Sequence, residues 1–178
     1  MTLADYKMLH APEMAEDAFV AALRDSPAAG EARTMYRTLK VEGVSPACFL
    51  GFFHVESKYG TVGVCNDYDT KNPGNVRTPA SLSLSASLTP DIPGKGRYAK
   101  YATWTNGTLD WAKRIKGPKY AGSALLTVRQ VLPKYAPSHD NNDPDAYART
   151  VLAMVERWGG KGDKVALRIG CGLTRGTL

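Results

Sequence analysis

The sequence lacks the features that define several large classes of protein. No run of apolar residues approaches the length of about 18 that a membrane-spanning helix needs, so no membrane span is expected. Residues 1–7 contain no basic region followed by an apolar one, so no signal peptide is expected either. We therefore expect the chain to act inside the cell, to leave it by another route, or to be a domain of a longer exported protein.

Cysteines are few, and their spacing argues against the common cysteine motifs. Cys48, Cys65 and Cys171 contain no Cys-x-x-Cys pair, which disfavours a metal or redox motif. Cys48 lies in an apolar segment and is expected to pack in the core, while Cys65 and Cys171 are interpreted as thiols, with a disulfide left open. The polar run from His139 to Asp143 lacks the glycine and distal glutamate of a calcium loop. No metal and no cofactor are expected.

The charge balance is basic, but the basic residues are scattered. The 23 lysines and arginines against 17 acidic residues give a net charge of +6. Such a surface favours anionic partners such as nucleic acid, acidic lipid or an acidic cell-wall polymer, although solubility alone also explains it. No basic run and no nucleic-acid motif is present, so nucleic acid is not the expected partner.

The length and composition suit one soluble domain. The 178 residues are enough for one compact core but not for two full domains, and 43% hydrophobic with 22% charged residues is ordinary for a globular protein. No internal repeat is present, and a monomer is expected.

The pattern along the chain divides residues 1–178 into four parts. Helical spacing predicts helical regions over 12–59 and 105–158. Residues 60–100 are rich in turn-forming residues and are expected to form short strands and loops. Apolar and polar residues alternate over 81–88, which predicts a strand there, with a mobile loop as the alternative because the segment is low in complexity. Residues 159–178 form a polar tail. The sequence predicts an α+β domain, mainly α, with a small irregular β-containing insert between helices. The expected helices are 13–24, 27–41, 46–59, 108–116, 123–134 and 144–158.

One of these helices carries the most informative residue. Ser45 can cap its first turn, Pro46 suits its first position, and Gly60 is a natural stop. Glu56 follows the apolar residues of this helix at helical spacing, so its carboxylate shares their face. Those apolar residues are Phe49, Phe52 and Phe53.

A carboxyl group in that position suggests acid chemistry. It is costly to bury unless it is paired or its pKa is raised. A glycosidic oxygen is protonated by a general acid when the bond is cleaved, and a carboxylic acid that keeps its proton near neutral pH can supply that proton. The alternative is a Glu56 side chain that reaches solvent or pairs with Lys58 or Arg77.

Several motifs, in order, resemble those of the lysozyme-like endo-β-N-acetylglucosaminidases. A helix ending in Glu-Ser-Lys-Tyr-Gly-Thr (56–61) leads to Asn-Pro-Gly-Asn-Val-Arg (72–77). An Arg-x-Tyr strand element (97–104) and a following helix are similar too. Lys-Tyr-Ala (134–136) followed by Asp-Pro-Asp-Ala-Tyr (143–147) resembles the family's Tyr-Ala-x-Asp-Pro-x-Tyr element, with an insert.

The resemblance covers residues 30–158 and implies a lysozyme-like fold. It implies cleavage of β-1,4 bonds in peptidoglycan glycan strands at the cell wall, by a phage-type lysin released from the cytoplasm or by part of an exported protein. Lytic transglycosylase, muramidase and an inactive wall-binding module remain alternatives. Residues 72–77 are shorter than the family's corresponding stretch, and 78–96 match no part of it.

The resemblance and the chemistry together suggest roles for individual residues. Glu56 is the expected general acid, and Asp67 or Asp69, with Asp91 as a more distant candidate, is expected to be a second carboxylate, unless these aspartates only form turns. Tyr135 is expected to bind an N-acetyl group or to position Glu56, unless it only packs on the core.

Five further residues are expected to bind the sugar substrate. Aromatic rings offer flat apolar area to sugars, and asparagine amides suit acetamido groups. The alternatives are core packing for the tyrosines, turn formation for the asparagines and a solvated arginine. The expected substrate-binding residues are Tyr59, Asn72, Asn75, Arg77 and Tyr101. His54 is expected to be a packed or surface residue.

Overall fold

The computed structural model describes residues 6–9, 14–77, 87–120, 127–138 and 143–158. The described chain is mainly helical with one small antiparallel sheet, which confirms the α+β, mainly α, class. Its elements are α1 (Glu16–Leu23), the 3-10 turn η2 (Ala29–Glu31), α2 (Ala32–Glu42), α3 (Pro46–Ser57), α4 (Gly63–Asp67), β1 (Ser87–Leu88), β2 (Ala99–Lys100), α5 (Trp104–Lys116), α6 (Val128–Tyr135) and α7 (Pro144–Arg157).

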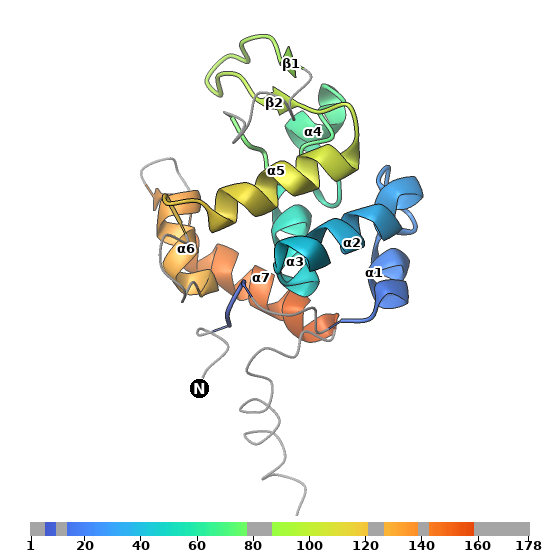
Figure 1. Cartoon of the computed structure of the whole chain (residues 1–178). Helices are drawn as coiled ribbons and strands as arrows, with labels where there is room; N and C mark the ends of the chain where they lie inside the picture. Colours follow the sequence, from blue (N-terminus) through green and yellow to red (C-terminus); the bar gives the residue numbers. More distant parts are fainter. Residues whose placement is uncertain (1–5, 10–13, 78–86, 121–126, 139–142, 159–178) are drawn as a thin grey trace, which may run out of the picture.

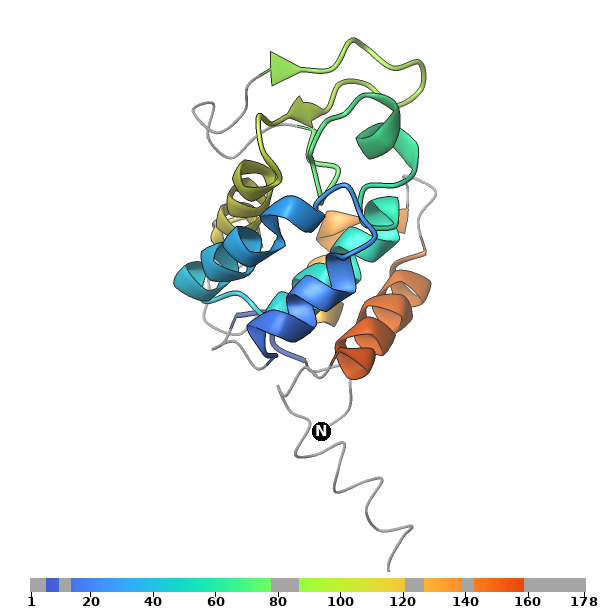
Figure 2. The same cartoon turned by 90° about the vertical axis from the view of Figure 1, so that its right-hand side faces the viewer.

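Helix α3 lies at the centre of the molecule (Figures 1 and 2). It packs against α2, α4 and α7, while α2 also packs on α1 and α5, and α6 packs on α7. Every residue from Pro46 to Phe53 is buried, so α3 is covered on all sides and not only along the predicted apolar face. A helix that is apolar all round belongs in the interior, and the position of α3 follows from this composition.

The predicted signals at the ends of α3 are confirmed in part. The Ser45 Oγ accepts a hydrogen bond from the Cys48 N–H at 3.1 Å, and Pro46 occupies the first turn. The helix ends at Ser57, before the predicted stop at Gly60, because Lys58 and Tyr59 take left-handed backbone angles with φ of 49° and 62°.

The α5 helix begins at Trp104, four residues before the predicted start at 108. Two groups satisfy its first N–H donors: the Thr103 Oγ1 accepts from Asn106 N, and the Glu31 carboxylate accepts from Trp104 N and Thr105 N. The Glu31 contact is long-range, which is why local sequence did not place this start.

The second predicted helix, 27–41, begins later than expected. Ser26 forms a turn in which its Oγ donates to the Leu23 carbonyl and accepts from Ala28 N, and α2 begins only at Ala32. It ends at Glu42, one residue beyond the expected end, and Gly43 after it takes a left-handed φ of 67°.

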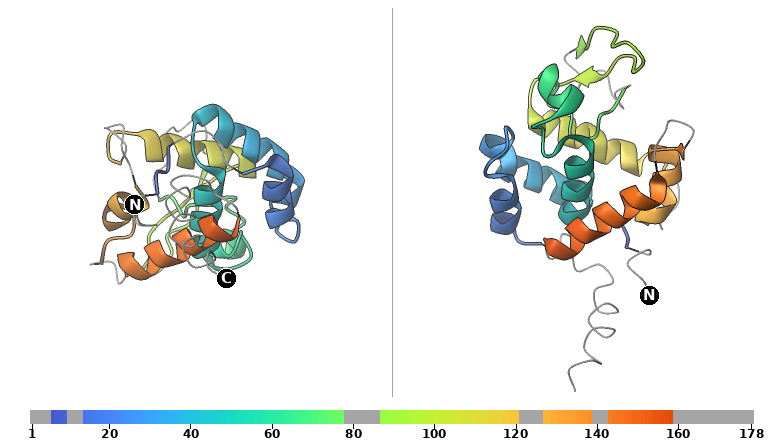
Figure 3. Two further views of the ribbon diagram at one scale, coloured as in Figure 1. Left: turned by 90° about the horizontal axis from the view of Figure 1, so that it is seen from below. Right: turned by 180° about the vertical axis from the view of Figure 1, so that it is seen from behind.

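The region between residues 60 and 100 contains the small sheet and one unpredicted helix. Strands β1 and β2 are antiparallel, with Ser87 opposite Lys100 and Leu88 opposite Ala99, and they lie beside α4 at one end of the molecule (Figure 3). Most of the alternating segment 81–88 lies outside the described residues, as do 123–126, 139–142 and 159–178 with Cys171. Cys48 and Cys65 are buried. No helix within the described ranges is long and apolar enough to cross a membrane.

The crossing of α3 and α7 depends on a glycine. A Cβ atom at Gly51 would lie 2.9 Å from Val151 Cγ1 and 3.0 Å from the Val151 backbone. We expect Gly51→Ala to lower the free energy of unfolding by about 1–3 kcal/mol in urea denaturation, despite the better helix propensity of alanine. Gly30→Ala is the matched control, because a Cβ there meets no atom within 4 Å. A Gly51→Ala protein as stable as the wild type would contradict the proposed close packing.

Candidate functional site

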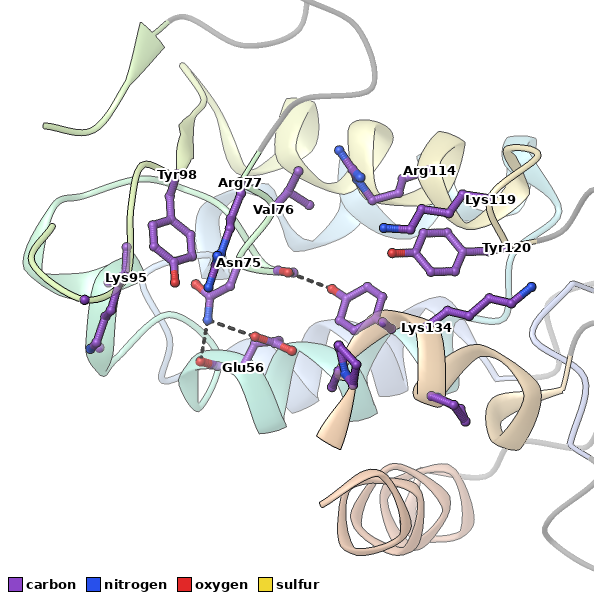
Figure 4. A pocket seen from close by; sticks show the side chains of 18 residues that line it. Glu56, Asn75, Val76, Arg77, Lys95, Tyr98, Arg114, Lys119, Tyr120 and Lys134 are labelled. Carbon is purple, nitrogen blue, oxygen red and sulfur yellow. Dashed lines mark hydrogen bonds between the residues drawn. The ribbon is translucent and has the colours of Figure 1, made fainter. Parts of the chain in front are cut away.

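A pocket of about 900 Å³ opens at the C-terminal end of α3 (Figure 4). Its volume lies in the range of roughly 300–1,000 Å³ that is typical of ligand sites. Its lining comes from the ends of α3, α5 and α6, the start of α4, the chain that follows α5 and α6, and two loops between α4 and β2. In residue numbers these are 56, 63–64, 74–77, 94–95, 98, 114, 119–120 and 133–137.

Glu56 lies at this pocket and is held by two neutral donors. The Tyr147 hydroxyl donates to Oε1 at 2.5 Å, and the Asn75 amide donates to Oε2 at 2.9 Å. Lys58 and Arg77, the alternative partners from the sequence, have other neighbours. The Lys58 Nζ lies 3.2 Å from the His54 ring, and the Arg77 guanidinium lies 5.7 Å from the centre of the Tyr98 ring.

The surroundings of Glu56 favour its neutral form. Burial raises its pKa above the ordinary 4.5, because the charged form loses contact with water, and the hydrogen bonds from Tyr147 and Asn75 lower it by less. The net shift is upward. Glu56 therefore keeps its proton to a higher pH than an exposed glutamate, and it faces a cavity to which that proton can be delivered.

Asn75 reaches Glu56 from a loop that a second asparagine holds in shape. The Asn72 side chain is buried, accepts from Val76 N, and donates to the carbonyls of Val76 and Ala99, each at 2.9 Å. Asn75 then adopts a left-handed φ of 45°, which asparagine tolerates well, and its amide also donates to the Glu56 carbonyl. Asn75 lines the pocket as expected, whereas Asn72 uses its side chain to shape the loop.

Tyr135 acts on the same loop instead of on Glu56 directly. Its hydroxyl donates to the Gly74 carbonyl at 2.6 Å and accepts from Trp111 Nε1 at 3.1 Å. Glycine is required at position 74, because a Cβ there would lie 2.3 Å from the Trp111 ring and 2.6 Å from the Tyr135 hydroxyl. Tyr135 lines the pocket, and its hydrogen bonds reach the backbone next to Asn75 and the Trp111 ring.

Tyr147 is the residue that sequence reasoning missed. Helix α7 begins at Pro144, as expected, and the Asp143 carboxylate accepts hydrogen bonds from Asp145 N and Ala146 N. The structure shows in addition that α7 crosses α3 closely, which brings the Tyr147 hydroxyl to Glu56. The signal was present, since Tyr147 ends the motif quoted above, but its direction depends on this helix crossing.

The expected second carboxylates lie away from the pocket lining. Asp67 and Asp69 are exposed, Asp67 ends α4 instead of lying in a loop, and Asp69 pairs with Lys71 at 2.9 Å. Asp91 is exposed as well. Among the described lining residues, Glu56 is the only one with a carboxyl group.

The two tyrosines that were expected to bind sugar also lie elsewhere. Tyr59 packs against Phe53 and His54, and its hydroxyl contacts Met154 Sδ at 3.8 Å. Tyr101 is 1% exposed and donates to Asp110 Oδ2 at 2.9 Å. Neither ring lines the pocket, whereas Arg77 does. The tyrosines that do line it, besides Tyr135, are Tyr98 and Tyr120.

Comparison with known proteins gives no match: no family model, no curated protein and no solved structure matches this chain. The described residues also contain no group of three or more His, Cys, Asp or Glu side chains placed to hold a metal ion. The chemistry of the Glu56 pocket is therefore the basis for a functional assignment.

The hydrogen bond from Tyr147 leads to a prediction about the pKa of Glu56. Tyr147→Phe removes a hydrogen bond that favours the carboxylate, so the pKa of Glu56 should rise further, as measured by ¹³C NMR titration of its carboxyl carbon. The free energy of unfolding should fall by about 1 kcal/mol.

Tyr36→Phe is the matched control for this measurement. It removes a buried tyrosine hydrogen bond of similar kind, to the Met14 carbonyl at 2.8 Å, at a residue outside the pocket lining. It should leave the pKa of Glu56 unchanged. Equal pKa values in wild type and Tyr147→Phe would show that the hydroxyl does not act on this carboxyl.

Proposed function

We propose that this protein cleaves β-1,4 glycosidic bonds in the glycan strands of peptidoglycan, with Glu56 as general acid. The observation that carries this proposal is a half-buried carboxyl group, held by neutral donors and with a raised pKa, at a pocket of ligand size. Together with the motif order from Glu56 to Tyr147, this supports a lysozyme-like domain, with endo-β-N-acetylglucosaminidase as the first candidate.

The proposed step is a proton transfer that breaks the bond. Glu56 gives its proton to the glycosidic oxygen, the C–O bond to the anomeric carbon breaks, and the leaving sugar departs with a new hydroxyl. A water molecule then bonds to the anomeric carbon and releases a proton that returns to the Glu56 carboxylate. The carboxylate that remains is stabilised by the Tyr147 hydroxyl and the Asn75 amide, which already point at its two oxygens. These two residues position Glu56 and stabilise its charged product.

One observation favours lytic transglycosylase as a second candidate. A hydrolase that uses two carboxylates needs them about 5–5.5 Å apart for retention or about 6.5–9.5 Å apart for inversion. The described lining contains Glu56 as its single carboxyl group. In a transglycosylase, a hydroxyl of the substrate attacks the anomeric carbon and passes its proton back to Glu56, so one carboxyl group suffices.

The decisive experiment is Glu56→Gln, which keeps the shape of the side chain and removes the acid. We expect wall-clearing activity to fall about 10²–10⁴-fold with wall binding unchanged. Mass spectrometry of the products then identifies the bond: reducing N-acetylglucosamine ends indicate a glucosaminidase, reducing N-acetylmuramic acid ends a muramidase, and anhydro ends a transglycosylase. A wild-type protein that binds walls but releases no product from any of them would instead be a binding module.

The raised pKa of Glu56 also predicts how stability depends on pH. Between 4.5 and the raised value, the folded state holds a proton that the unfolded chain releases, so stability falls as pH rises through this window. Glu56→Gln removes this loss. The free energy of unfolding of Glu56→Gln minus that of wild type should therefore increase with pH and level off above the folded-state pKa, in urea titrations at several pH values. A difference that decreases with pH would mean that the fold favours the charged carboxylate.

A further inference from the structure

The pocket lining is strongly basic, a feature that the proposed acid chemistry does not require. Against the single carboxyl group of Glu56, the described lining contains five cationic side chains. They are Arg77, Lys95, Arg114, Lys119 and Lys134. The scattered basic residues of the sequence are thus partly gathered at one place by the fold.

The cations form two groups on either side of Glu56 (Figure 4). The first group is Arg77 and Lys95, beside Tyr98; the second is Arg114, Lys119 and Lys134, beside Tyr120. Each group has one cation over its tyrosine ring: Arg77 is 5.7 Å from the Tyr98 centroid, and Lys119 is 5.5 Å from the Tyr120 centroid. The three cations of the second group come from α5, the chain after it and α6, so tertiary folding brings them together.

These cations are not neutralised by carboxylates of the described chain. The ion pairs formed there use other basic residues, including Lys71 with Asp69, Lys116 with Glu42 and Arg129 with Asp145, and none involves the five lining cations. The Nε of Arg114 is buried and has no hydrogen-bond partner among the described residues. Like charges that line one concave surface repel each other, and anions are concentrated there.

We infer that this pocket selects glycan strands that carry anionic substituents on both sides of the cleaved bond, and that it discriminates against uncharged glycans. This inference rests on the proposed function. A neutral sugar chain offers only hydroxyl and acetamido groups to the cations, whereas charge-assisted bonds to carboxylate or phosphate are stronger. In a bacterial wall the anions are the carboxylates of the peptide stems or the phosphates of attached polymers.

The test uses paired substitutions that each remove two charges. Arg77→Gln with Lys95→Gln removes the first group, and Arg114→Gln with Lys119→Gln disrupts the second. Lys40→Gln with Lys113→Gln is the control, because both lysines are exposed and lie outside the lining while the net charge changes equally. Each lining pair should lower kcat/KM on intact walls by about tenfold or more, mainly by raising KM. It should also make kcat/KM less sensitive to salt concentration. The control pair should change neither kcat/KM nor its sensitivity to salt.

Substrate variants identify the anion and separate this inference from the proposed function. Cleavage and co-sedimentation are measured with intact walls, with strands stripped of peptides by an amidase, with walls freed of phosphate polymers, and with chitin oligosaccharides. Loss of binding on removal of peptides or of phosphates supports the inference and names the source.

The inference is overturned if the protein binds all four substrates equally and the lining variants have the same kcat/KM as the wild type. This holds even if cleavage supports the proposed function. Binding that depends on charge in a protein without cleavage overturns the proposed function instead. Because co-sedimentation does not require turnover, the two failures are distinguishable.

Discussion

The contacts of one phenylalanine connect the core of this protein to its pocket. The Phe52 ring lies 5.3 Å from Trp111, 5.0 Å from Tyr135 and 5.4 Å from Tyr147, measured between centroids. These three rings belong to α5, α6 and α7, so α3 is fixed against three helices at a single point. Glu56 lies one helical turn after Phe52, on the same face. The packing that holds the helices together therefore also places the carboxyl group beside Tyr147.

This arrangement puts an ionisable group where the fold disfavours charge. The partners of Glu56 are a hydroxyl and an amide, which orient the carboxyl group without neutralising it as a cation would. Burial raises the pKa more than these two hydrogen bonds lower it. A site of this kind reduces stability at neutral pH, and it is the environment that a proton donor needs.

The sequence predicted what depends on local patterns and missed what depends on distant contacts. The Ser45 cap, the Pro46 start and the place of Glu56 on the face of Phe52 follow from patterns over a few residues. Helix α4 was missed because five residues are too few to show a helical period. Asn72 is expected from the sequence to bind substrate, but its side chain bonds to the backbone of its own loop and of Ala99. An asparagine that binds a ligand and one that shapes a loop look identical in a sequence. The same ambiguity applies to Tyr101, whose partner is the buried Asp110.

The pocket contains both a basic lining and a carboxyl group that keeps its proton, and these two features have opposite electrostatic effects. Cations close to Glu56 would favour its charged form and lower its pKa. The causes that shift the pKa of Glu56 are burial, which raises it, and the hydrogen bonds from Tyr147 and Asn75, which lower it by less. The net shift of this pKa is upward although the pocket lining is basic. A ligand that spans the pocket can then meet positive charge at both ends and a neutral acid between them, the charge distribution suited to an anionic strand cut by a proton donor.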